Sequence, residues 1–159
     1  AHYLIVRYNP GMPSAIDSAV ALELDNQLCF ALYSASLAMT KLYKPLLADL
    51  GLTYPQYLAM LVLWERDGLM VSQLGERLFL DSGTLTPLLK RLETAGLIAR
   101  IRALDDERRV HITLTPAGRK LKSRAARIPA CIVKAAQRPM PEIVSLTRQI
   151  QALRQRLTA

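Results

Sequence analysis

The chain has 159 residues, of which 51% are hydrophobic, and a formal net charge of +8. These values exclude a wholly disordered protein and allow one domain with a substantial core, with or without a dimerisation arm. No apolar run approaches the roughly 20 residues that a membrane-spanning helix needs. We therefore expect a soluble, cytoplasmic protein without a membrane partner.

The positive charge lies mainly in the last third of the chain. Residues 1–70 carry four basic and six acidic side chains, residues 71–115 carry seven and six, and residues 116–159 carry ten and one. The excess suggests an anionic partner such as nucleic acid. One basic run either reaches flanking phosphates or forms a solvated helix face: Arg119, Lys120, Lys122, Arg124 and Arg127.

Two helices are expected in the first half of the chain. Apolar residues recur at helical spacing from Leu22 to about Leu50, and Pro45 should kink or divide this first helix because it removes a backbone hydrogen bond. Thr53 followed by Pro55 is typical of a helix start. The helix that follows is apolar almost all round, so we expect it to be buried.

A helix-turn-helix is predicted next. Ser72 can cap a short helix that ends before the turn Asp81-Ser82-Gly83, and a second helix then runs to Gly96. Its leucines occupy one face, which leaves short polar and basic groups to contact DNA bases or phosphates. The candidate DNA-binding residues of this helix are Ser82, Thr84, Thr86, Pro87, Lys90 and Arg91.

A two-stranded hairpin follows directly. Residues 97–102 and 110–115 alternate as strands around a polar tip that contains Asp106, Arg108 and Arg109. A cation at such a tip can enter the narrow, electronegative minor groove, and Asp106 can orient an arginine. The alternative, a three-helix core with an incidental charged hairpin, explains the leucines but not the placement of the polar groups.

The C-terminal region is expected to be helical. A helix opens at Thr115-Pro116 and continues past Cys131 until Pro139. In the last helix, apolar residues step by 3, 4, 3 and 4, as in a coiled-coil seam: Ile143, Leu146, Ile150, Leu153 and Leu157. This pattern favours a homodimer, with packing inside one chain as the alternative.

The fold class is therefore mainly α with a small β-hairpin wing: a winged helix-turn-helix flanked by helices that form a dimerisation region. Residues 53–115 form the DNA-binding domain, and residues 22–52 and 116–159 form the helical dimerisation region. Residues 1–21 are an N-terminal arm or a remnant of the expression sequence. A dimer of this kind suits a pseudo-palindromic double-stranded operator.

The two cysteines, Cys29 and Cys131, are too few for a disulfide scaffold or a zinc cluster, and no metal or cofactor is expected. A cysteine among leucines is usually a small core residue. A reactive thiol needs a cation, a helix N-terminus or hydrogen-bond donors, and Cys29 is expected about two turns into its helix. Tyr33, Tyr43 and Tyr54 are the candidate donors.

The sequence resembles the MarR family of regulators, and within it the organic hydroperoxide resistance repressors. The resemblance runs from about Leu22 to the C-terminus. It is strongest in five segments: residues 24–33 around Cys29, residues 43–47, residues 52–57, residues 80–87 and the acidic-basic wing segment 105–109.

The resemblance implies that a reduced dimer represses a gene, that organic hydroperoxides oxidise Cys29 to a sulfenic acid, and that the protein is not an enzyme. It implies that Tyr43 and Tyr54 hydrogen-bond the Cys29 sulfur across the dimer interface. Arg108 matches the wing-tip arginine of the family. Cys131 is either the resolving thiol of an intersubunit disulfide or a buried structural thiol.

Two other functions are open at this point. A MarR repressor can be relieved by non-covalent binding of a phenolic or aromatic ligand, with Cys29 only lining the pocket. A thiol peroxidase with a basic surface is the third possibility, but it leaves the wing and the recognition helix unexplained.

Overall fold

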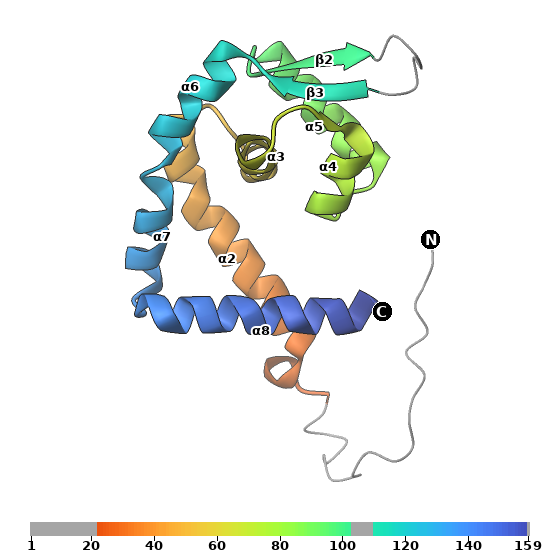
Figure 1. Ribbon diagram of the computed structural model, residues 1–159. Helices are drawn as coiled ribbons and strands as arrows, with labels where there is room; N and C mark the ends of the chain where they lie inside the picture. The colour runs from red at the N-terminus through yellow and green to blue at the C-terminus, as the bar shows by residue number, and fades with distance from the viewer. Residues whose placement is uncertain (1–21, 103–109, 159) are drawn as a thin grey trace. The chain divides into compact units, whose positions relative to one another are not determined.

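The computed structural model describes residues 22–102 and 110–158, which form helices and one small antiparallel sheet (Figure 1). The chain divides into two compact units, residues 1–39 and residues 40–159, and each is described by itself. Helix α2, Leu28–Ala48, belongs to both units. The predicted fold class, mainly helical with a winged helix-turn-helix, is confirmed by the elements described below.

In the first unit, the regular helix begins later than the leucine spacing predicted. Residues Leu24–Asn26 form the short 3-10 helix η1, and Gln27 is extended before α2 begins. Polar side chains stabilise this local turn, since Asn26 Nδ2 donates to the Glu23 carboxylate at 3.1 Å. Such side chains offer the backbone an alternative to the α-helix.

Pro45 does not divide the helix, one of the two predicted outcomes, because α2 continues through this residue to Ala48. The chain then turns at Gly51, whose φ of 67° favours glycine. Helix α3, Tyr54–Glu65, starts where Thr53 and Pro55 predicted it. The Thr53 N–H donates to Gln56 Oε1 at 2.8 Å, which helps to cap the helix start.

The second unit holds the helix-turn-helix and the wing. Helices α4, Val71–Leu78, and α5, Ser82–Thr94, precede strands β2, Ile98–Arg102, and β3, Val110–Leu114. The strands pair antiparallel, with Ile98 opposite Leu114. A third strand, β1, Leu69–Met70, pairs with β3 and was not predicted, because two residues carry no periodicity.

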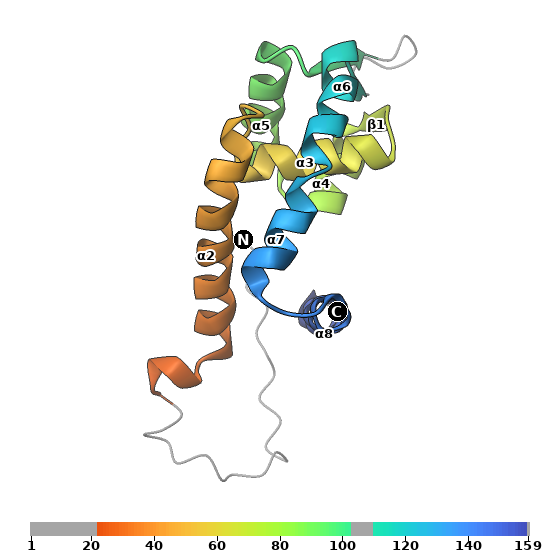
Figure 2. The ribbon, with the colours of Figure 1, turned by 90° about the vertical axis from the view of Figure 1, so that its left-hand side faces the viewer.

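Three helices complete the chain: α6, Pro116–Ala125, α7, Ile128–Ala136, and α8, Met140–Thr158. The expected single helix past Cys131 is wrong, because it breaks at residues 126–127 between α6 and α7 (Figure 2). Pro129 is the physical reason, since a proline lacks the N–H that an unbroken helix needs and is tolerated only in a first turn.

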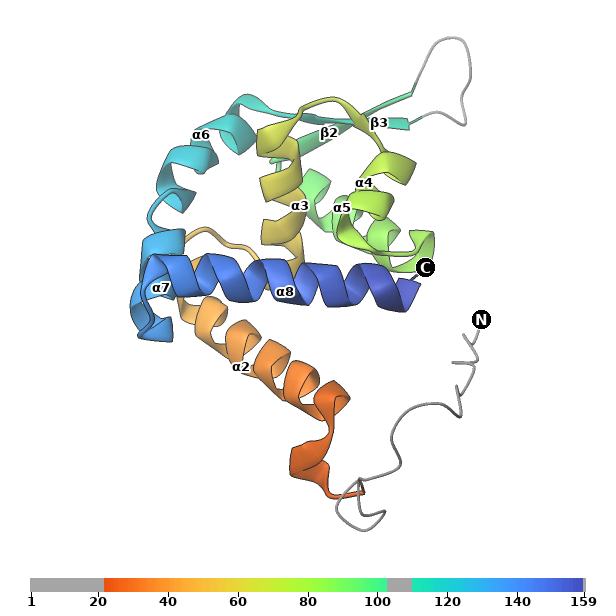
Figure 3. The ribbon, with the colours of Figure 1, turned by 60° about the horizontal axis from the view of Figure 1, so that its bottom comes forward.

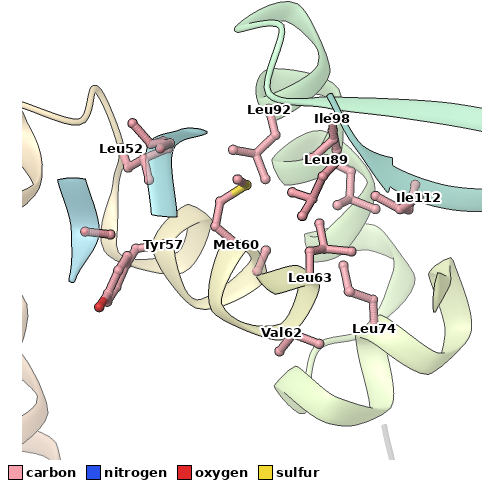
Figure 4. Packing of buried hydrophobic residues seen from close by; sticks show 14 of the residues in the cluster. Leu52, Tyr57, Met60, Val62, Leu63, Leu74, Leu89, Leu92, Ile98 and Ile112 are labelled. Carbon is pink, nitrogen blue, oxygen red and sulfur yellow. The ribbon is translucent and has the colours of Figure 1, made fainter. Parts of the chain in front are cut away.

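The core of the second unit surrounds α3 (Figure 4). Met60 and Leu63 of α3 are buried, as the apolar sequence of this helix predicted. They meet apolar side chains from every neighbouring element of the winged helix: Leu74 of α4, Leu89 and Leu92 of α5, Ile98 of β2 and Ile112 of β3. This cluster sets the orientation of α5 and the wing.

The start of α6 packs very closely on the chain between α5 and β2. A Cβ atom added to Gly118 would lie 2.0 Å from the Leu97 carbonyl oxygen. The Thr115 hydroxyl donates to the Gly96 carbonyl at 2.6 Å, and the Thr115 N–H donates to the Leu97 carbonyl at 3.1 Å. Only glycine therefore fits at position 118.

We expect Gly118→Ala to lower the free energy of unfolding by about 1–3 kcal/mol, since the added methyl group must push α6 away from the Leu97 carbonyl. Urea unfolding measures the change. Ala117→Ser, at the exposed neighbouring position, is the control. Equal stability of the two variants would show that this close contact is unimportant.

Candidate nucleic-acid interface and thiol site

Helix α5 begins at a well-formed cap. The Asp81 carboxylate accepts hydrogen bonds from the Thr84 backbone N–H at 2.9 Å and from the Thr84 hydroxyl at 3.0 Å. These two hydrogen bonds, the backbone one first, hold the pKa of Asp81 below its ordinary value. The cap fixes the N-terminus of α5, which is the end that a recognition helix presents to base edges.

All candidate DNA-binding residues of α5 are exposed: Ser82, Thr84, Thr86, Pro87, Lys90 and Arg91. Leu85, Leu89 and Leu92 are buried on the opposite face. The amphipathic pattern predicted from the sequence is therefore confirmed. Pro87 lies inside the helix without ending it.

The turn between α4 and α5 differs from the prediction in two details. Ser82 and Gly83 already belong to α5, and the turn is made by Phe79, whose φ is 55°, and Leu80. Ser72 does not cap α4, because the helix begins at Val71. The side chain of Gln73 accepts the Met70 N–H instead, at 3.0 Å.

Helix α8 returns toward this turn (Figure 3). The Arg154 guanidinium lies 4.1 Å from the centroid of the Phe79 ring, within the range of a cation–π contact. The C-terminal helix thus touches the helix-turn-helix of its own chain.

Strands β2 and β3 form the base of the wing. Asp106, Arg108 and Arg109 lie outside the described residues, so their roles remain predictions. At the base, Arg100 Nε lies 3.9 Å from the Glu93 carboxylate, which joins β2 to the last turn of α5. The recognition helix and the wing are therefore linked by an ion pair as well as by the core.

The basic run after the wing contacts the protein itself. Four of its five side chains donate to acceptors of the second unit: Arg119 to Asp67, Lys122 to the Trp64 carbonyl, Arg124 to the Asp49 carbonyl and Arg127 to the Asp49 carboxylate. In the described part of the chain no such contact is recorded for the Lys120 ammonium. These hydrogen bonds therefore hold α6 and the start of α7 against α3 and the residues that precede and follow it. The sequence of the basic run did not indicate this role.

Cys29 lies in the first unit, in the first turn of α2, and it is exposed. The expectation that it lies two turns into its helix is wrong, because α2 begins only at Leu28. In the first turn of a helix, backbone N–H groups have no partner in the helix, and the dipole favours negative charge. Tyr33, one turn further along, is 61% exposed.

A cluster of tyrosines occupies the second unit. The Tyr43 ring lies 4.5 Å from the Tyr54 ring and 5.8 Å from the Tyr57 ring, measured between centroids. Burial raises the pKa of Tyr43 to about 12, with smaller contributions from Tyr54 and Tyr57. Burial also raises the pKa of Tyr54 and of Tyr57. At neutral pH these phenols stay protonated and can donate hydrogen bonds.

Two aromatic residues of this region were not predicted from the sequence as site residues. Tyr57 and Trp64 pack edge to face, with centroids 6.3 Å apart. Their positions, three and ten residues after Tyr54, place all three near one face of α3, and this spacing was the available signal. Both line a surface cavity of about 480 Å³ with Lys122, Ala125 and other residues.

Cys131 lies in α7 of the second unit and is exposed, which disfavours the alternative of a buried structural thiol. Residues 22–102 and 110–158 contain no cluster of three or more histidine, cysteine or acidic side chains able to hold a metal ion. Among the described helices, none is long and apolar enough to cross a membrane.

Comparisons with known proteins agree with this arrangement. The family described as transcriptional regulator SarA/Rot matches residues 41–125. The organic hydroperoxide resistance transcriptional regulator of Bacillus subtilis (strain 168) is 51% identical over 132 residues, which cover 83% of this chain and 90% of that protein.

Solved structures of AbfR, a protein of Staphylococcus epidermidis, are also similar. Reduced AbfR bound to DNA is 34% identical, with a TM-score of 0.67, and the match covers 86% of this chain and 95% of that one. Disulfide-formed AbfR is 36% identical, with a TM-score of 0.60, and the match covers 82% and 91%.

A capped, polar recognition helix followed by a β-wing defines a winged helix-turn-helix regulator of transcription. The chain belongs to the MarR family, and within it to the organic hydroperoxide resistance regulators. The resemblance inferred from the sequence motifs is thus confirmed.

The tyrosine cluster predicts a late step in an alkaline titration. The pKa of Tyr43 is raised from 10.0 to about 12, so its stabilising effect is complete below pH 10 and is lost as the pH rises through about 12. Ultraviolet absorbance of phenolate should show a component near pH 12 that Tyr43→Phe abolishes. It should persist in Tyr33→Phe, and its persistence in Tyr43→Phe would refute the assignment.

Proposed function

We propose that this protein is a redox-sensing transcriptional repressor. The reduced homodimer binds a pseudo-palindromic operator, and oxidation of Cys29 by an organic hydroperoxide releases the DNA. The observation that carries the proposal is the exposed position of Cys29 in the first turn of α2. A cysteine attacks a peroxide as the thiolate, and an exposed position leaves the sulfur open to the peroxide.

The sulfur chemistry needs no cofactor. The thiolate sulfur attacks one peroxide oxygen, the O–O bond breaks, and two electrons pass from sulfur to the peroxide. The alkoxide leaves and takes up a proton to become an alcohol, and Cys29 becomes a sulfenic acid. We propose that Tyr43 and Tyr54 of the partner subunit donate hydrogen bonds to the thiolate, with Tyr33 as a further donor.

Cys131 is proposed as the resolving thiol of the other subunit. Its sulfur attacks the sulfenic sulfur of Cys29, an S–S bond of about 2 Å forms, and water leaves. The exposure of Cys131 supports this role. Closing the bond must move a helix. We propose that this movement turns the DNA-binding domains of the two subunits out of register with the half-sites of the operator.

A homodimer is supported by the exposed apolar residues in the seam of α8. Leu146, Ile150 and Leu157 are 52%, 43% and 58% exposed in the single chain. A second copy that covers this seam makes residues 22–52 and 116–159 the dimerisation region and leaves residues 53–115 free to read DNA. Two such heads would contact half-sites roughly 34–36 Å apart.

Operator contacts are proposed for the exposed residues of α5 in the major groove and for Arg108 and Arg109 of the wing in the minor groove, with Asp106 orienting an arginine. The relatives described above are regulators and not enzymes, and each sensor thiol would react once per oxidation event instead of turning over. A repressor of this kind acts in the cytoplasm.

A second candidate, relief by an aromatic anion, has one observation in its favour. The cavity beside Tyr57 and Trp64 has aromatic walls and is lined by Lys122, whose ammonium could pair with a carboxylate or phenolate. A repressor relieved in this way would still be induced after Cys29→Ser, whereas a peroxide sensor would not.

The redox mechanism is tested by operator binding before and after one equivalent of cumene hydroperoxide. Wild type should lose affinity on oxidation and regain it with dithiothreitol, and Cys29→Ser should stay bound. Cys131→Ser should form no intersubunit disulfide on a non-reducing gel. Release of DNA without a Cys29–Cys131 linkage would refute the two-cysteine mechanism, and full binding by oxidised wild type would refute the sensor itself.

The DNA-binding surface is tested by Lys90→Ala. If Lys90 contacts a phosphate, its loss should weaken operator binding and lower the slope of log K against log salt by about one. Lys134→Ala, at an exposed site of α7, is the matched control and should leave the slope unchanged. Equal slopes in both variants would remove Lys90 from the interface.

A further inference from the structure

An aromatic chain joins the tyrosine cluster to α6. We define it as Tyr43, Tyr57 and Trp64, whose successive ring centroids lie 5.8 and 6.3 Å apart. Tyr57 is buried and packs against both of the other rings, so a movement of its ring changes both contacts. At the far end, the Trp64 indole N–H donates to the Gly118 carbonyl of α6 at 2.9 Å.

Trp64 makes two hydrogen bonds with α6. Besides the indole hydrogen bond, the Trp64 carbonyl accepts from Lys122 Nζ at 3.0 Å, one turn further along the helix. Side chain and backbone of one residue thus hold two successive turns of α6. A displacement of Trp64 must therefore displace the start of α6 or break both contacts.

The start of α6 is in turn joined to the DNA-binding elements. Gly118 N–H donates to the Thr115 hydroxyl at 3.0 Å, and that hydroxyl donates to the Gly96 carbonyl at the end of α5. Thr115 N–H donates to the carbonyl of Leu97, the residue before β2. Because Gly118 fits against Leu97 without space for a Cβ atom, α6 cannot move toward Leu97 without moving the end of α5 and the base of the wing.

The cavity beside the aromatic chain supplies room for movement. Tyr57 and Trp64 form part of its wall, together with Ala125 and Pro129 of the following helices. A ring that borders a cavity of about 480 Å³ can rotate into it without overlapping other atoms on that side.

We propose that Tyr57 and Trp64 are positioning residues that transmit the redox state of the sensor from Tyr43 to the start of α6, and through it to the recognition helix and the wing. The inference rests on the proposed function, in which Tyr43 donates to the Cys29 thiolate. When oxidation removes that charged acceptor, Tyr43 loses its partner and its ring shifts, Tyr57 follows, and the contact between Trp64 and Gly118 changes.

The native protein offers a direct test, because Trp64 is its single tryptophan. The full chain on operator DNA is treated with one equivalent of cumene hydroperoxide, and Cys29 oxidation, DNA release and tryptophan emission are followed in the same samples. Emission should change in step with release, and Cys29→Ser should show neither change. Oxidation and release with unchanged Trp64 emission would overturn the inference while leaving the proposed function intact.

Trp64→Phe provides the second test, since phenylalanine keeps an aromatic ring beside Tyr57 and lacks the indole N–H donor. The reduced variant should bind operator close to wild type. Its ratio of oxidised to reduced operator Kd should fall about five-fold, as expected for the loss of one hydrogen bond from the coupling.

Ser123→Ala is the matched control, because it removes a hydrogen bond of α6 to the Lys120 carbonyl that lies off this path. An unchanged Kd ratio in Trp64→Phe, with Cys29 oxidised as fully as in wild type, would overturn the inference. If cumene hydroperoxide affects wild type and Cys29→Ser alike, the sensor assignment fails and the inference fails with it.

Discussion

The burial of α3 is the constraint on which the rest of the second unit depends. This helix is apolar on nearly every side, so most of its circumference must be shielded from water. Met60 and Leu63 reach the core formed with α4, α5 and the sheet, whereas Tyr57 and Trp64 face α6 and the cavity. One helix therefore sets the orientation of the DNA-reading elements and also carries the groups that connect them to the tyrosine cluster.

The polar atoms at the edge of this core have specific partners. A half-buried indole N–H needs an acceptor, and Trp64 finds one in the Gly118 carbonyl. The Asp67 carboxylate accepts hydrogen bonds from the backbone N–H groups of Gly68 and Leu114 and from the Arg119 guanidinium. These bonds fix the end of α3, the wing and α6 to one another more specifically than apolar contact alone.

The basic residues that follow the wing and those of the recognition helix have different roles. Much of the basic excess of residues 116–159 lies close to its own acceptors, so a basic run in sequence was a poor measure of a DNA-binding surface. Exposed ion pairs of this kind are individually weak, typically about 0–1 kcal/mol, but several of them along one helix fix its position. The recognition helix, by contrast, exposes few charges, and its contacts with DNA depend on the placement of individual groups.

Patterns along the chain were sufficient to predict the recognition helix, its buried leucines and the two wing strands, because each depends on residues near one another in sequence. The sequence motifs were also sufficient to predict the family. The patterns misplaced the start of α2, and with it Cys29, because leucines can keep a helical spacing across a non-helical turn. They also missed β1, which forms only by pairing with a strand distant in sequence. They missed the break before α7 because the helix was expected to continue to Pro139, whereas Pro129 already interrupts it.

Only the tertiary structure brought Tyr43, Tyr57, Trp64 and Gly118 into contact, over a separation of up to 75 positions along the chain. Such contacts have no periodicity, because they arise when whole helices pack to exclude water.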